Sequence, residues 1–129
     1  MIYTSYFANI KNLPPNIVPV AICGKSPKGW KGLEYKKLAP KYKFFMEWKE
    51  NNDNEFYIQH FKNEVLNCLN FKEALHDLAV LLKTNPNYDE DTHDSIALIC
   101  YEKPEDFCHR HLVANWFIEH GYSVEEFEN

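Results

Sequence analysis

The stretch Ser95-Ile96-Ala97-Leu98-Ile99-Cys100-Tyr101 is an almost unbroken apolar run. It lacks the alternation of apolar and polar residues that is typical of a strand with one face in water. A short continuous run of this kind indicates a strand buried on both faces, as in the interior of a parallel sheet. We therefore predict that residues 95–101 form the strongest strand of the fold and lie inside its sheet.

Shorter apolar runs predict three more strands, at residues 2–7, 17–23 and 122–127. Amphipathic patterns predict helices at residues 42–50, at residues 55–69, from Asn70 onward and up to about residue 120, where Gly121 ends the last one. Strands that alternate with helices indicate an α/β fold. We predict one small three-layer domain over residues 1–129, with a mostly parallel sheet of about four strands and flanking helices.

The composition agrees with one folded domain. The chain has 129 residues, of which 45% are hydrophobic, so it is long and apolar enough to bury a core. No apolar run approaches the roughly 20 residues of a membrane span, and no secretory signal is visible. We therefore expect a cytoplasmic protein without membrane contact, and reduced cysteines. No cofactor is predicted, and the sequence leaves the oligomeric state open.

The charges are segregated along the chain. Thirteen of the 14 basic residues are lysines, and the remaining one is Arg110. Residues 1–49 carry nine lysines and two glutamates, a net charge of +7, whereas residues 50–129 have a net charge of −12. A basic segment of this kind attracts phosphates, docks on the acidic part of the same chain, or binds an acidic partner.

The loop after the second predicted strand concentrates this positive charge. Lys25, Lys28 and Lys31 surround Trp30. Lysines attract phosphates and aromatic rings stack on bases, so this loop predicts a phosphate-bearing small molecule or a nucleic acid as partner. Neither GxxxxGK[ST] nor GxGxxG is present, so the loop is not a standard nucleotide loop. A solvated lysine face is the alternative.

The segment after the buried strand holds most of the chemically versatile residues, namely Cys100, Glu102, Cys108, His109 and Arg110. Ligands of parallel sheets bind beyond the carboxyl ends of the strands. The first strand ends at the same edge, so we expect Ser5 and Tyr6 to line this crevice too, together with the lysine loop.

Helix geometry decides which of these side chains face the crevice. We expect Asp106 to cap the last helix, with Cys108 in its first turn, where the helix dipole favours a thiolate; a start at Pro104 is the alternative. His109 falls on the apolar stripe of that helix and is expected to meet Glu102 or Cys100.

These positions suggest roles in a reaction. Glu102 and His109 would be an acid/base pair, Cys108 a nucleophile or anion-site thiol, and Arg110 a ligand for an anion, with Cys100 beside them.

Two other hypotheses stay open. In the first, the same residues form a structural polar network in a non-catalytic binding module, with Glu102 paired to Arg110 or Lys103. In the second, Cys100, Cys108, His109 and His111 supply ligands to a metal. His109 and His111 lie about 200° apart on a helix, so they cannot easily reach one ion together. No metal ligand is therefore assigned.

The pattern Cys100-x-Glu102 followed by Cys108-His109-Arg110 resembles the signature of a widespread prokaryotic family, domain of unknown function 488, which includes YeaO-like proteins. The resemblance implies a small α/β protein over nearly the whole chain. Many members carry an Asp-x-Arg pair on the second strand, near the same edge, where this chain has Ala21-Ile22-Cys23-Gly24-Lys25. Lys25 could replace the positive charge of that pair, but the acid has no obvious substitute.

Overall fold

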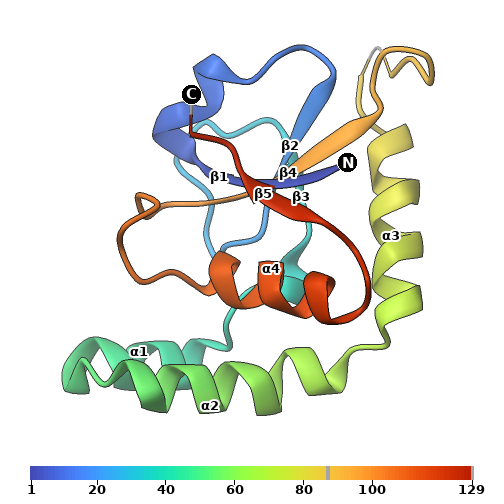
Figure 1. Cartoon of the computed structure of the whole chain (residues 1–129). Helices are drawn as coiled ribbons and strands as arrows, with labels where there is room; N and C mark the ends of the chain where they lie inside the picture. Colours follow the sequence, from blue (N-terminus) through green and yellow to red (C-terminus); the bar gives the residue numbers. More distant parts are fainter. Residues whose placement is uncertain (87, 129) are drawn as a thin grey trace.

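The fold is a five-stranded parallel sheet, seen in a computed structural model that describes residues 1–86 and 88–128. The strands are β1 (Ile2–Tyr6), β2 (Ile17–Ala21), β3 (Leu33–Glu34), β4 (Ser95–Cys100) and β5 (Val124–Glu126). Their order across the sheet is β3-β2-β4-β1-β5, and every pair is parallel (Figure 1). The predicted α/β class with a mostly parallel sheet is thus confirmed.

Strand β4 is the centre of the sheet, as the apolar run predicts. All six of its residues are buried, because β1 and β2 flank it and both of its faces are covered. The register pairs Tyr6 with Cys100 and Ala21 with Ile99. The carboxyl ends of β1, β2 and β4 therefore meet at one edge of the sheet.

Strand β3 is not predicted by the sequence pattern. It has two residues, and Leu33 pairs with Val20 of β2. A two-residue edge strand is too short to show the alternation that marks a strand, so only the pairing itself reveals it. The sheet consequently has one strand more than the four predicted.

The two faces of the sheet are covered unequally. Figure 1 shows α4 (His109–Glu119) under one face, with α1 (Tyr42–Asn51) and α2 (Asn54–Glu64) below it and α3 (Phe71–Lys83) at the side. The short 3-10 helix η1 (Phe7–Asn12) covers the opposite face, where Ile17, Ala97 and Ile99 form a small core. Two further 3-10 helices are η2 (Lys36–Leu38) and η3 (Leu66–Cys68).

Most of the core therefore lies on the α4 side. Val20, Leu98, Phe61, Val113 and Phe117 are among its most buried members. No helix in the described part of the chain is long and apolar enough to cross a membrane.

Local capping explains where α2 and α3 begin and where α4 ends. Asp53 accepts hydrogen bonds from two backbone N–H groups at the start of α2, and Asn70 accepts from Glu73 at the start of α3, as predicted. The predicted helix 55–69 is wrong in length, because α2 ends at Glu64 and the chain continues into η3. Gly121 follows α4 with φ of +91°, the left-handed conformation predicted for it.

The predicted start of α4 is also wrong. Asp106 donates its backbone N–H to Lys103 in a turn that has Pro104 at its second position, so it does not cap the helix. Phe107 then packs on Trp48 and Tyr57, which holds the chain extended. The N-cap is Cys108, with extended φ and ψ of −154° and 143°.

Candidate functional site

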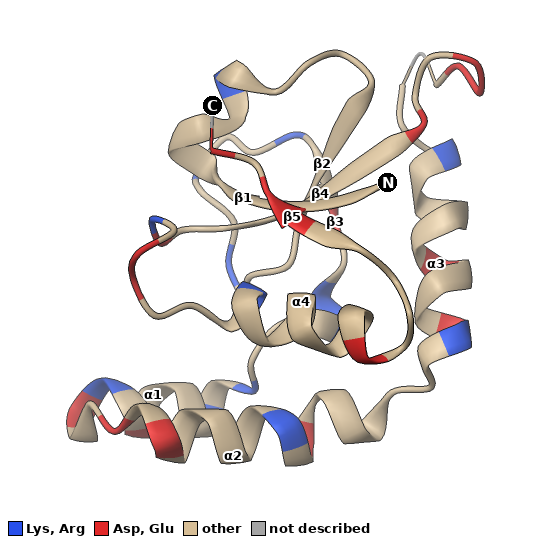
Figure 2. Cartoon of the chain, in the orientation of Figure 1, with Lys and Arg blue, Asp and Glu red and all other residues tan. Residues whose placement is uncertain are grey.

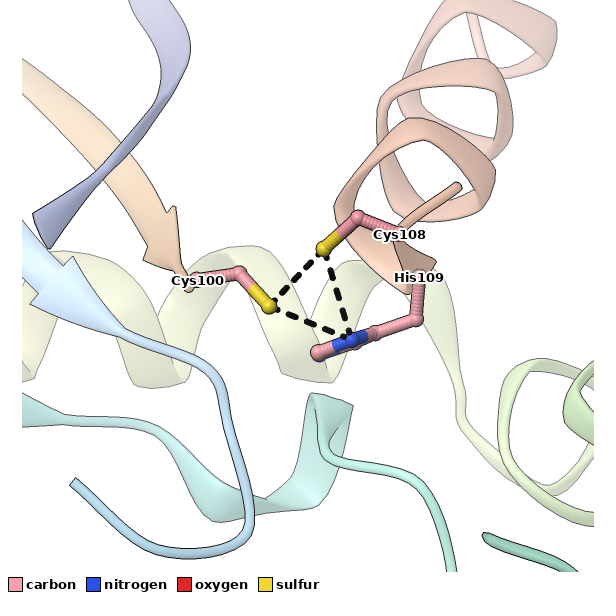
Figure 3. A group of neighbouring side chains, drawn as sticks. All are labelled: Cys100, Cys108 and His109. Carbon is pink, nitrogen blue, oxygen red and sulfur yellow. Dashed lines mark hydrogen bonds between the residues drawn. The ribbon is translucent and has the colours of Figure 1, made fainter. Parts of the chain in front are cut away.

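Two sulfur atoms and one imidazole nitrogen meet where β4 ends and α4 begins. The Sγ atoms of Cys100 and Cys108 lie 2.8 Å apart and share a hydrogen bond. Nδ1 of His109 lies 3.5 Å from Cys100 Sγ and 3.9 Å from Cys108 Sγ. Figure 3 shows the three side chains pointing toward one another from two elements. We call this group the thiol–imidazole cluster.

The imidazole of His109 is held in one orientation from its other side. Nε2 lies 2.7 Å from the backbone oxygen of Ile22, just beyond β2, and the ring packs against Phe61. A carbonyl oxygen only accepts, so Nε2 carries the hydrogen. In the neutral ring the lone pair of Nδ1 is therefore directed at the two sulfurs.

The cluster is shielded from water, and the pKa values of its two thiols shift in opposite directions. Cys100, Cys108 and His109 are each at most 5% exposed. The hydrogen bond with Cys100 lowers the pKa of Cys108, and His109 adds to this effect against the opposing effect of burial. The same hydrogen bond, together with burial, raises the pKa of Cys100. The contact between the two sulfurs therefore favours ionisation of Cys108 over ionisation of Cys100.

Arg110 does not face the cluster but closes a separate polar network. Its guanidinium is fully buried and binds Glu126 of β5 through Nε at 3.1 Å and Nη2 at 3.0 Å. Nη1 donates to the backbone oxygen of Glu102 at 2.6 Å, and Thr4 donates to the Glu126 carboxylate. The pair expected between Arg110 and the Glu102 side chain is thus replaced by a bidentate pair with Glu126.

The side chain of Glu102 lies outside the cluster. It is exposed, and the Glu102 backbone oxygen accepts a hydrogen bond from Arg110. Of the two partners predicted for His109, Cys100 is in contact with the imidazole. The predicted contact with the Glu102 carboxylate is wrong, because His109 uses its two ring nitrogens for Ile22 and the sulfurs.

Ser5 and Tyr6 end β1 near this edge but are engaged inside the protein. Ser5 is fully buried and its hydroxyl donates to the backbone oxygen of Phe127 at 2.9 Å. The ring of Tyr6 lies beneath the Arg110 guanidinium, 5.8 Å from ring centre to Cζ. Both residues therefore support β5 and Arg110.

The lysine loop reaches the same edge from β2. Lys25, Lys28 and Lys31 are exposed, and Trp30 is half-buried against Phe7. The hydroxyl of Tyr101 donates to the backbone oxygen of Lys25 at 2.5 Å, which ties this loop to the segment after β4. Figure 2 shows blue stretches along the loop that follows β2 and red residues on β5.

Sequence reasoning missed several residues that build the site. Tyr57 of α2 is 2% exposed; burial and the nearby charges of Cys108 and Cys100 raise its pKa. The sequence does carry a signal for Glu126. It shares a strand face with Val124, which packs against the core, and an acid facing inward needs a partner. The backbone oxygen of Ile22 leaves no signal in side-chain patterns.

A family model described as "Active DUF488-N3 subclade" matches residues 10–121. The chain belongs to the DUF488 family. The matched range holds Cys100, Glu102 and the Cys108-His109-Arg110 run that carries the resemblance in the sequence. No curated protein and no solved structure matches this DUF488 chain.

Proposed function

We propose that this DUF488 chain is an enzyme in which Cys108 is a nucleophile, acting on a phosphate-bearing ligand at the carboxyl end of the parallel sheet. The observation that carries this proposal is the thiol–imidazole cluster. A thiol at the start of a helix, with the open nitrogen of an oriented imidazole beside it, is the arrangement of an activated cysteine.

The cluster offers a simple proton path. Cys108 transfers its proton to Nδ1 of His109, either directly across 3.9 Å or through Cys100. The sulfur lone pair then forms a bond to an electrophilic atom of the substrate. The leaving group departs with the bonding electrons and takes the proton back from His109, so charge and atoms balance.

The lysine loop supports an anionic ligand. Lys25, Lys28 and Lys31 are exposed next to the strand ends. Arg110, in contrast, is engaged in a buried ion pair with Glu126. Arg110 is therefore a residue that positions β5, and we assign the attraction of phosphate to the three lysines.

Cys108 is only 4% exposed, so a substrate reaches its sulfur only after a local opening, and we assign that opening to the segment 101–107. Most of this segment is exposed, and the hydroxyl of Tyr101 binds it to the lysine loop. Opening this connection would uncover the thiol.

The same burial favours a second function. In a non-catalytic binding module, the cluster and the pair of Arg110 with Glu126 would serve only to hold the sheet edge together. The description of the family model as an active subclade agrees better with the first proposal.

Alkylation of the reduced, metal-free chain tests the proposal. We expect iodoacetamide to label Cys108 faster than the exposed Cys68, with mass spectrometry locating the label. Cys68→Ser is the control that keeps this rate, and Cys108→Ser removes it. A Cys108 that reacts no faster than Cys68 supports the structural module instead.

A further inference from the structure

We propose that Cys100, Cys108 and His109 bind one Zn²⁺ ion, and that the bound ion holds Cys108 in a protected state. The first part stands on the geometry of the cluster alone. The second part rests on the proposed function, since it concerns the thiol that acts as nucleophile there.

The three donor atoms are already gathered. Cys100 Sγ, Cys108 Sγ and His109 Nδ1 all lie within 4.8 Å of one another, and they converge from the end of β4 and the start of α4 (Figure 3). His111, the fourth ligand considered from the sequence, is not part of this group in the described chain. Sulfur and imidazole donors suit Zn²⁺ and disfavour Mg²⁺ and Ca²⁺, which need oxygen ligands.

The imidazole is oriented as a metal ligand requires. Histidines that bind a metal through one nitrogen usually donate the other N–H to a carbonyl or carboxylate. Nε2 of His109 has such a partner in the Ile22 oxygen at 2.7 Å, which leaves Nδ1 facing the sulfurs. The orienting contact is therefore present before any metal arrives.

The charge and the burial of the thiol–imidazole cluster also suit Zn²⁺. Two thiolates and a neutral imidazole cancel the charge of Zn²⁺, so a site at most 5% exposed can hold the complex without net charge. The nearby charge of Arg110 is already compensated by Glu126.

Binding requires a small rearrangement. Zn–S bonds of about 2.3 Å in tetrahedral geometry place two sulfurs about 3.7 Å apart, so the sulfurs must separate by about 1 Å from their present contact. Three protein ligands leave a fourth position open for water or a substrate group. With one of its lone pairs bound to the ion, the Cys108 sulfur is a weaker nucleophile than the free thiolate.

Cobalt titration of the full reduced chain, freed of metal with a chelator, tests this. We expect one Co²⁺ per chain, with sulfur-to-cobalt charge-transfer absorption and the strong visible bands of a tetrahedral site, both displaced by Zn²⁺. Cys100→Ser, Cys108→Ser and His109→Gln are each expected to weaken binding by at least about 100-fold. Cys68→Ser is the matched control and keeps the bands.

Two results would overturn the metal site: a folded wild-type chain without charge-transfer bands, or bands that survive in Cys108→Ser and vanish in Cys68→Ser. If a ligand variant fails to fold, thermal stabilisation of the wild-type chain by Zn²⁺ decides, and its absence counts against the site. Alkylation separates the two proposals. Fast labelling of Cys108 without cobalt bands would reject the metal site and leave the nucleophile. Cobalt bands without fast labelling would reject the nucleophile and leave the metal site. A labelling rate that Zn²⁺ does not change would reject the protected state of Cys108.

Discussion

Nε2 of His109 lies 2.7 Å from the backbone oxygen of Ile22, 87 positions earlier in the chain. This contact fixes which nitrogen of the imidazole faces Cys100 and Cys108. The chemistry of the site therefore depends on a main-chain atom at the end of β2, and no side-chain substitution can remove that atom. Side-chain variants around it can still test what the site does.

The hydrogen bond of Tyr101 to Lys25 should control access to the thiols. Tyr101→Phe removes it, and a bond worth about 1 kcal/mol corresponds to an about fivefold larger open population. We expect iodoacetamide to label Cys108 faster by about that factor in this variant. Tyr122→Phe, which changes an exposed tyrosine at the far end of α4, should leave the rate unchanged; equal rates in all three proteins would contradict this form of gating.

The pair of Arg110 with Glu126 should be a large contributor to stability. Glu126→Gln leaves the guanidinium buried without its carboxylate, and breaking a buried pair costs about 3 kcal/mol in the free energy of unfolding. Urea denaturation measures this loss. Glu125→Gln changes the exposed neighbour on the same strand and should cost almost nothing. Equal stability of the two variants would show that the pair is not coupled to the fold.

The lysine loop should carry the affinity for phosphate-bearing ligands. We expect a Lys25→Gln, Lys28→Gln, Lys31→Gln triple variant to lose about tenfold in affinity for any nucleotide that stabilises the wild-type chain, with a weaker salt dependence. Thermal shifts across a nucleotide panel give the measurement. The matched control changes Lys62, Lys72 and Lys83, three exposed lysines on α2 and α3. A panel without any stabilising nucleotide would argue against this ligand class.

Tyr35 should determine how strongly the protonation of Asp77 lowers the stability of the fold at acid pH. Its hydroxyl donates to the Asp77 carboxylate at 2.6 Å and is the main cause that lowers the pKa of Asp77 below the ordinary 3.8. A carboxylate with a lowered pKa adds stability above its unfolded pKa, and this is lost as the pH falls through the folded pKa.

Tyr35→Phe should therefore raise the pKa of Asp77 and reduce the stability lost between neutral pH and acid. Carbon-detected NMR titration of the Asp77 carboxyl measures the first effect, and unfolding at a series of pH values measures the second. Lys37→Gln, which removes the exposed partner at 3.3 Å, should shift the pKa less. An unchanged Asp77 titration in the Tyr35 variant would refute the assignment.

The central strand is predictable from the sequence, because a strand that is buried on both faces needs an apolar residue at almost every position. The run 95–101 has to be apolar on both faces, and it forms β4 between β1 and β2. Strand β3 has no such pattern, because two residues at a sheet edge are too few to show any periodicity. The sequence pattern places the start of α4 wrongly, because the turn at Lys103 and the packing of Phe107 outweigh the capping preference of Asp106.

The candidate site was predictable in its residue types and only partly in its contacts. Helix geometry turns His109 toward the sheet, which brings it to Cys100. The partner of Arg110 could not be derived from local spacing, because Glu126 comes from β5 on the far side of β1. A main-chain acceptor such as the Ile22 oxygen is likewise set by the tertiary fold.

The ion pair between Arg110 and Glu126 has a consequence for the newly made chain. Until the ribosome has released residue 126, the guanidinium of Arg110 has no carboxylate to accept it, and docking α4 onto the sheet would bury an uncompensated charge. The edge of the sheet that holds the thiols can therefore close only after residue 126 has left the ribosome, although β1, β2 and β4 are complete by residue 100.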